Sequence, residues 1–162
     1  MPLKRKSVIT KVIEEDRLYK VYSFINKQIE IGKQCMIVYP LIEESEKSDI
    51  AAATEGYGIL KQKVFNTNDI KVGLIHGKMK SEEKKSIMNY FETNKISILV
   101  STTVIEVGID VPNATIMLIE HAERFGLTQL HQLRGRVGRG EDKSYCILVN
   151  RGTSEVSLHR LS

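Results

Sequence analysis

Five short apolar runs, separated by longer polar or amphipathic stretches, constrain the fold of this chain most. Each run is apolar throughout instead of alternating, which is typical of strands buried on both faces of a parallel sheet. The runs are 34–40, 71–77, 96–102, 115–120 and 144–150. This pattern predicts an α/β fold with a mainly parallel central sheet and helices on both faces. Because ligands of such folds bind beyond the carboxyl ends of the strands, the loops that follow the strands should be the informative ones.

Three of the intervening stretches are predicted to be helical. Residues 15–31 carry one apolar stripe at helical spacing and are followed by Gly32, a typical helix terminator. Residues 81–93 begin with Ser81, the expected N-cap, and two glutamates follow in the first turn. Residues 48–65 are also predicted to be helical, although two glycines within them disfavour a helix.

Composition bounds the class of protein. The chain has 162 residues, enough for one domain with its own core, and 41% of them are hydrophobic. The net charge of +4 favours an anionic partner such as nucleic acid or phosphate. No apolar stretch is long enough to cross a membrane, and the basic first residues are not followed by a signal-peptide pattern. We therefore expect a cytoplasmic protein with no membrane partner and no oligomer.

The two cysteines, Cys35 and Cys146, lie in apolar runs far apart in the sequence. Such cysteines are usually buried free thiols in a reducing compartment, so we predict neither a disulfide nor a metal site.

Residues 132–140 read QLRGRVGRG and combine unusual positive charge with unusual backbone freedom. If 127–139 is a helix, its polar and apolar residues occupy separate sides, the polar ones within an arc of about 80°. The polar side holds Gln129, Gln132, Arg136 and Arg139, and the apolar side holds Leu127, Leu130, Leu133 and Val137. Gly135 and Gly138 would let a bulky group approach the backbone. This arrangement favours a phosphate-binding face, and a solvated basic helix end is the alternative.

The same nine residues, 132–140, resemble motif VI of the superfamily 2 helicases. Residues 99–115, LVSTTVIEVGIDVPNAT, resemble motif V, and residues 73–91 resemble the segment that precedes motif V. Residues 36–46, MIVYPLIEESE, resemble motif IV. These segments occur in the family's order and together cover 33–149. The stretch is most similar to RecG-type branch-migrating DNA helicases, and transcription-repair coupling factors are the alternative.

The resemblance implies a motor of two RecA-like domains with ATP in the cleft between them. In that family the first domain supplies a phosphate loop and an acidic motif that holds Mg²⁺. The sequence contains neither a G-x-x-x-x-G-K-[ST] nor a D-E-x-H or D-E-x-D motif, so the resemblance implies the second domain. We expect residues 1–14 to be a lead-in from the first domain, 15–150 to be the helicase C-terminal domain, and 151–162 to be a truncated tail.

The resemblance also implies roles for residues near ATP. Arg136 and Arg139 match arginine fingers that neutralise charge on the transferring γ-phosphate. Gln132 matches a glutamine near the γ-phosphate and the attacking water. Gly108 and Asp110 match a motif V turn in which the carboxylate accepts hydrogen bonds from the ribose hydroxyls.

A second set of residues is implied to contact DNA. Ser101 and Thr102 match the motif V hydroxyl residues that contact a nucleic-acid phosphate, and His76, Gly77 and Lys78 match a turn that follows the DNA backbone. The implied partners are branched double-stranded DNA and the first RecA-like domain of the same parent chain. The implied activity is ATP-dependent fork reversal and branch migration in recombination and repair, with this chain inactive alone. A nucleotide- or metabolite-binding domain and a non-catalytic nucleic-acid- or protein-binding module are the alternatives.

Overall fold

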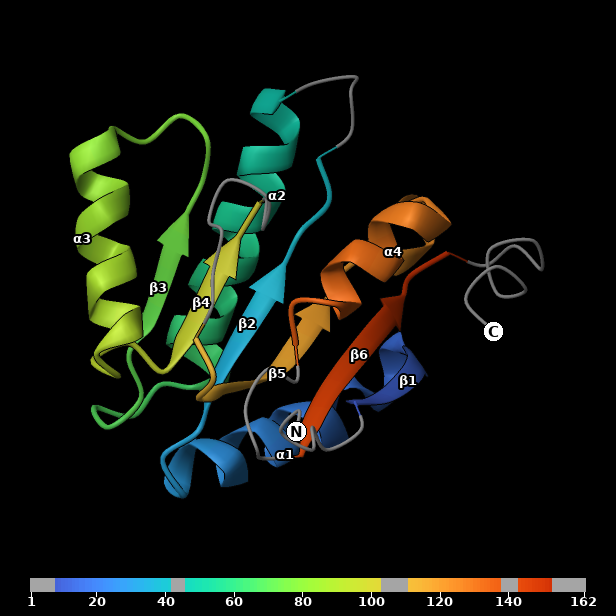
Figure 1. Cartoon of the computed structure of the whole chain (residues 1–162), viewed down its shortest axis with the longest axis horizontal. Coiled ribbons are helices and arrows are strands. Elements are labelled where there is room, and N and C mark those ends of the chain that lie inside the picture. The colour runs from blue at the N-terminus through green and yellow to red at the C-terminus, as the bar shows by residue number, and fades with distance from the viewer. Residues whose placement is uncertain (1–7, 42–45, 103–110, 138–142, 153–162) are drawn as a thin grey trace, which may run out of the picture.

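The computed structural model describes residues 8–41, 46–102, 111–137 and 143–152. Six strands form one sheet in the order β1-β6-β5-β2-β4-β3 (Figure 1). Every neighbouring pair is parallel. The strands are β1 (Val8–Glu14), β2 (Gln34–Val38), β3 (Val72–Ile75), β4 (Ile98–Ser101), β5 (Ala114–Ile119) and β6 (Ser144–Asn150). The predicted parallel α/β fold is confirmed, and all five predicted strands are present.

Four α-helices cover the two faces of the sheet. They are α1 (Leu18–Glu30), α2 (Glu46–Ile59), α3 (Ser81–Glu92) and α4 (Leu127–Arg134). Because successive strand side chains point to opposite faces, β2 shows which helix covers which face. Ile37 shares a buried cluster with Ile25 of α1. Met36 shares the opposite cluster with Phe91 of α3 and Leu133 of α4. Helices α1 and α2 therefore cover one face, and α3 and α4 cover the other.

Two of the predicted helices carry an extra turn at one end. A 3-10 turn, η1 (Glu15–Arg17), precedes α1, and Gly32 beyond α1 has a φ of 91°, the left-handed conformation that favours glycine. A π-helical turn, η2 (Leu60–Val64), follows α2. The prediction that Ser81 caps α3 is wrong. Lys80 is the N-cap, and Ser81 is the first helical residue.

The sequence prediction did not include β1. It pairs with β6 along its whole length, from Val8 beside Ser144 to Glu14 beside Asn150. It is one of the two edge strands and has no buried residue, so it mixes apolar and polar residues instead of forming a continuous apolar run. This is the physical reason why a search for apolar runs passes over it.

The prediction that Cys35 and Cys146 are buried free thiols is confirmed. Burial raises the pKa of the Cys146 thiol to about 11 and raises that of Cys35 further. Within the described residues, no helix has the length and apolar character that a membrane crossing requires.

Candidate functional site

Backbone hydrogen bonds bring the predicted DNA-contacting residues together at the carboxyl edge of the sheet. The Thr102 amide, just after β4, donates to the carbonyl of Ile75 at 3.3 Å. Ile75 is the last residue of β3, so the turn that begins at His76 lies beside Thr102. On the other side, the Tyr39 amide donates to the Ser101 carbonyl at 2.8 Å. The loops after β3 and β4, which the sequence analysis predicted separately as DNA contacts, therefore lie side by side at the carboxyl ends of these strands. We call this place the Thr102 edge.

The turn after β3 is fixed by its own histidine. The Lys78 amide donates to Nδ1 of His76 at 3.2 Å, and the Met79 amide donates to the His76 carbonyl at 3.2 Å. In the neutral imidazole this leaves the proton on Nε2, which is then a donor. Gly77 and Lys78 are exposed at the tip of the turn. The turn thus presents a backbone and a lysine to solvent, as a contact to a phosphate backbone requires.

Thr102 has an unsatisfied buried hydroxyl. The residue is 2% exposed, and its Oγ1 has no hydrogen-bond partner within the described part of the chain. A buried hydroxyl without a partner costs free energy, so its retention calls for an explanation. A ligand oxygen arriving at the carboxyl edge would supply the missing partner.

The prediction of a helix over 127–139 is wrong at its carboxyl end. Helix α4 ends at Arg134, with Gly135 as its C-cap. The chain continues in tighter turns, in which the amide of Arg136 donates to the Leu133 carbonyl at 3.0 Å and that of Val137 to the Arg134 carbonyl at 3.2 Å. Gly135, which was interpreted as space for a ligand, is instead the C-cap of α4.

The predicted apolar side of α4 is correct except at its start. Leu130, Leu133 and Val137 are buried in the core beneath α4, but Leu127 is 55% exposed. Leu127 is the first helical residue, one turn beyond the part of α4 that contacts the sheet. Gln132 is exposed, as a ligand-facing residue would be.

Arg136 lies beside the start of β5. Together with Val111 and Ala114 it lines a hollow of about 20 Å³, which is room for about one water molecule. Its guanidinium is partly buried and has no carboxylate partner among the described residues. An unpaired guanidinium suits an anionic group that approaches from outside the chain. Arg139, Gly108 and Asp110 lie outside the described residues.

The predicted DNA-contacting residues and Arg136 lie at opposite ends of the sheet. Ser101 pairs with Val38, the last residue of β2, whereas Ala114 pairs with Gln34, the first. These positions differ by four residue steps, about 13 Å along the strand. The expectation that ligands bind beyond the carboxyl ends therefore fits the Thr102 edge. It does not fit Arg136, because α4 runs back toward the start of β5.

A cluster of charged residues at the ends of β5 and β6 was missed by the sequence prediction. Arg151, assigned there to the tail, binds the buried carboxylate of Glu120 with Nε at 2.8 Å and Nη2 at 3.2 Å. The sequence feature that could have revealed this cluster is Glu120, since an acidic residue at the end of an apolar run needs a buried cationic partner.

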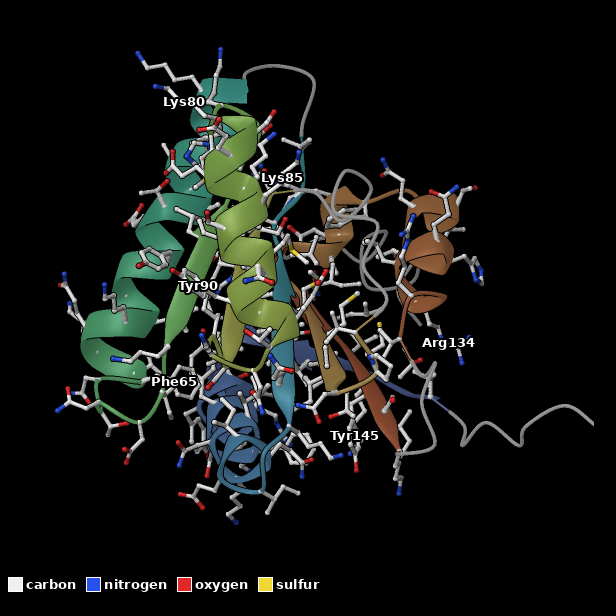
Figure 2. All side chains as sticks on the ribbon, turned by 60° about the vertical axis from the view of Figure 1, so that its left-hand side comes forward. Phe65, Lys80, Lys85, Tyr90, Arg134 and Tyr145 are labelled. Carbon is white, nitrogen blue, oxygen red and sulfur yellow. The ribbon has the colours of Figure 1, made fainter. Side chains whose placement is uncertain are left out.

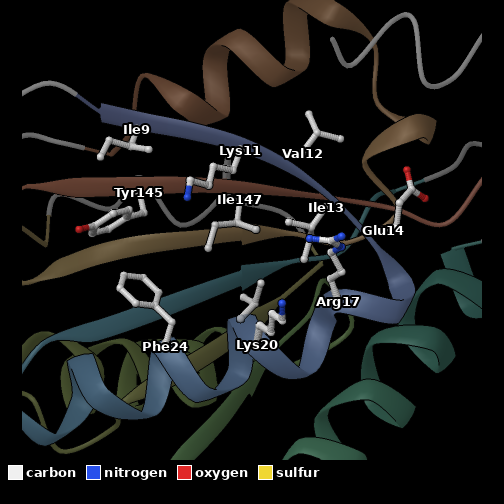
Figure 3. Close-up of a pocket in the computed structure, with 11 residues that line it drawn as sticks. Ile9, Lys11, Val12, Ile13, Glu14, Arg17, Lys20, Phe24, Tyr145 and Ile147 are labelled. Carbon is white, nitrogen blue, oxygen red and sulfur yellow. The ribbon is translucent and has the colours of Figure 1, made fainter.

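A larger hollow lies away from the predicted residues. A groove of about 590 Å³ separates β1 from α1 (Figure 3). Its lining is mainly apolar, with Phe24 of α1 facing Ile13 of β1 and Ile147 of β6, and Lys11 and Lys20 also line it (Figure 3). None of the predicted site residues lines it, so it is not the candidate site.

The family model for the helicase conserved C-terminal domain matches residues 15–141. The ATP-dependent DNA helicase RecG of Thermotoga maritima is 51% identical over 161 residues, which cover 99% of this chain and 20% of the relative. RecG of Bacillus subtilis is 49% identical over 161 residues, covering 99% of this chain and 23% of the relative. The chain thus spans about a fifth of the length of these curated relatives.

Solved structures of helicases are also similar to this chain. A structure of RecG bound to a three-way DNA junction matches with a TM-score of 0.78 and 48% identity, covering 99% of this chain and 20% of that one. Domain 2 of the DEAD-box helicase Mss116p bound to an RNA duplex matches with a TM-score of 0.69 at 22% identity, covering 89% of this chain and 54% of that one, which shows the fold alone. The predicted RecA-like fold and the resemblance to RecG are confirmed. The chain belongs to the helicase conserved C-terminal domain family.

Proposed function

We propose that this chain is the second RecA-like motor domain of a cytoplasmic, ATP-dependent helicase that remodels branched DNA in recombination and repair. One observation carries the proposal. The Thr102 edge and Arg136 lie at opposite ends of one sheet, and residues 103–110 join Thr102 to Val111 beside Arg136. The names of the similar proteins, a DNA helicase and a junction-bound RecG, support the choice of DNA as substrate.

The carboxyl edge is proposed to hold the DNA backbone. The hydroxyls of Ser101 and Thr102, the backbone around Gly77 and the Lys78 ammonium would contact phosphates. Such contacts position a strand without reading its sequence. His76 supports the turn through Nδ1 and leaves Nε2–H as a further donor.

The other end of the sheet is proposed to face ATP. ATP, with Mg²⁺ held by the first motor domain, supplies the γ-phosphoryl group for hydrolysis. Arg136 and Arg139 would neutralise its charge, Gln132 would orient water, and Gly108 with Asp110 would hold the ribose. Arg136 fits this role, because among the described residues it has no anionic partner and its hollow is too small to enclose a nucleotide. That fit favours a nucleotide shared between domains over a self-contained nucleotide-binding domain.

The proposed mechanism couples the two ends of the sheet. Closure of the domains brings Arg136 and Arg139 to the phosphates, and the Thr102 edge moves with them because both belong to one packed sheet. Opening after hydrolysis reverses the movement. Repeated cycles would then move the DNA grip along the duplex.

The test is the DNA-stimulated ATPase of the full-length parent, wild type against Arg136→Ala. Loss of an arginine finger should lower turnover on the order of 10³-fold with ATP affinity little changed. Arg139→Ala should behave in the same way. The control is Arg134→Ala, because Arg134 is exposed on the outer side of α4 (Figure 2). Unchanged turnover in both Arg136→Ala and Arg139→Ala would reject the arginine-finger role and favour a non-catalytic binding module.

A further inference from the structure

Arg151 joins three parts of the fold at the carboxyl edge. Its guanidinium binds Glu120 through Nε at 2.8 Å and Nη2 at 3.2 Å, and binds Glu15 through Nη1 at 2.6 Å. Its backbone amide donates to the Glu123 carboxylate at 2.8 Å. Glu120 directly follows β5, Glu123 lies in the 3-10 turn η3 (Ala122–Arg124), and Glu15 begins η1. One residue thus ties η3 to the ends of β1, β5 and β6.

The Glu120 carboxylate depends on this pairing. Glu120 is 2% exposed, and desolvating a carboxylate is costly unless it is paired and hydrogen-bonded. Arg151 supplies two parallel N–H donors, the geometry that binds a carboxylate most strongly. The hydrogen bond to Glu120 raises the pKa of the Arg151 guanidinium further above its usual value, so the guanidinium stays charged throughout the usual pH range.

Glu120 lies between the DNA edge and α4. Its amide donates to the carbonyl of Val38, the last residue of β2, at 2.8 Å, and the amide of the following residue, Tyr39, donates to the Ser101 carbonyl at 2.8 Å. The neighbour of Ser101 is Thr102. In the other direction, Glu120 leads through η3 into α4, which ends just before Arg136. Two backbone hydrogen bonds therefore link the Thr102 edge to Glu120, and the chain itself continues from Glu120 through η3 and α4 to Arg136.

We infer that Glu120, held by Arg151, is a positioning residue that keeps η3 and α4, and thus Arg136, in a fixed relation to the edge that carries Thr102. Without the ion pair, η3 would still be joined to the end of β5 by the chain. Its orientation on the sheet would no longer also be held by Arg151 at the end of β6. DNA bound at the edge would then no longer promote the arrangement of Arg136. This inference rests on the proposed function.

The experiment compares turnover with and without junction DNA in the full-length parent. Glu120→Gln keeps the shape of the side chain and removes its charge. We expect it to lower DNA-stimulated turnover about tenfold, with DNA-free turnover and the KM for ATP changed less than twofold. Arg151→Gln should give the same loss, and the double variant should lose no more than either single variant, because one interaction is removed in each case. The ratio of the two turnovers does not depend on the folded fraction.

The matched control is Glu15→Gln. Glu15 binds the same guanidinium, but its side chain is 69% exposed, so the stimulation ratio should be unchanged. If Glu120→Gln does not fold, Arg151→Lys keeps the charge, loses the bidentate geometry and should show a partial loss of the same ratio. An unchanged ratio, or equal falls with and without DNA, would overturn the inference. A wild-type parent without DNA-stimulated turnover would instead overturn the proposed function.

Discussion

At the residue scale, Thr102 is the most informative position. A threonine hydroxyl in a finished core is normally bonded, often to a backbone carbonyl one turn or one strand away. Here the hydroxyl is buried at the edge where β3 and β4 end, and no described group satisfies it. Its position and its missing partner are independent observations, and both agree with a phosphate contact. The sequence resemblance suggested the role, but only the structure shows the unsatisfied atom.

Thr102→Val should separate function from stability. Valine has nearly the same shape but no hydroxyl, so removing an unpaired buried hydroxyl should leave the free energy of unfolding unchanged or slightly higher. In the full-length parent, the same change should weaken the stimulation of ATPase by DNA while ATP affinity stays the same. Urea unfolding of this chain and DNA titrations of the parent's ATPase measure the two effects.

Thr115→Val is the control for this prediction. Thr115 is also 2% exposed with an unpaired hydroxyl among the described residues, but it lies near the start of β5, at the other end of the sheet. Its replacement should have the same small effect on stability and none on DNA stimulation. Equal loss of stimulation in both variants would argue that Thr102 acts through packing and not through its hydroxyl.

At the element scale, α2 shows how packing decides between two similar glycines. Both Gly56 and Gly58 lie within the helix, where sequence reasoning counts each as unfavourable. A Cβ atom added at Gly56 would overlap the Tyr39 hydroxyl oxygen and lie 2.7 Å from Cζ, whereas one added at Gly58 would meet nothing within 4 Å. Tyr39 is itself 8% exposed at the end of β2, so it has little room to move. Gly56 therefore sets how closely α2 approaches the sheet.

The two glycines should respond in opposite directions to alanine. Gly58→Ala should raise the free energy of unfolding by up to about 1 kcal/mol, because alanine favours the helix and the site is open. Gly56→Ala should lower it by about 1–3 kcal/mol, because the gain in helix propensity is smaller than the cost of overpacking against Tyr39. Urea unfolding of the two variants measures both. Stabilisation by Gly56→Ala would mean that Tyr39 can rotate away.

The elements themselves differ in how far the sequence predicts them. Strands β2 to β6 could be predicted because they are mostly buried on both faces, which favours apolar residues throughout the strand. Strand β1 could not, because an exposed edge needs no such run. The end of α4 was misplaced because Gly135 allows two interpretations, an open ligand face or a helix terminator, and local sequence does not distinguish them. In the structure it is the C-cap.

At the scale of the whole molecule, topology determines which predicted residues meet. The motifs gave residues and a chain order, but not that β3 and β4 are neighbours, which is what places the His76 turn beside Thr102. Nor did they indicate that α4 returns toward the start of β5, so that Arg136 lies at the opposite end of the sheet. Both facts depend on long-range packing. The Glu120–Arg151 pair also depends on it, since it joins residues 31 positions apart.

The isolated chain should bind DNA weakly and hydrolyse no ATP. Its sequence has no phosphate loop, and the hollow beside Arg136 is far too small for a nucleotide, so Arg136 has no substrate to act on. The carboxyl edge should still contact a few phosphates. For two or three contacts, a log–log plot of affinity against salt concentration should have a slope of about −2 to −3. Fluorescence anisotropy with a labelled three-way junction measures this slope.

Lys78→Gln tests where that binding occurs. Removal of one phosphate contact should make the slope about one unit less negative, whereas Lys20→Gln, on α1 beside the distant groove, should leave it unchanged. Equal effects of the two substitutions would mean that the net charge of +4 attracts DNA without a defined edge. Binding that does not respond to salt would argue against phosphate contacts altogether. DNA-stimulated ATP turnover by the pure chain would contradict the shared site, because every residue proposed to act on ATP here requires a nucleotide held by another domain.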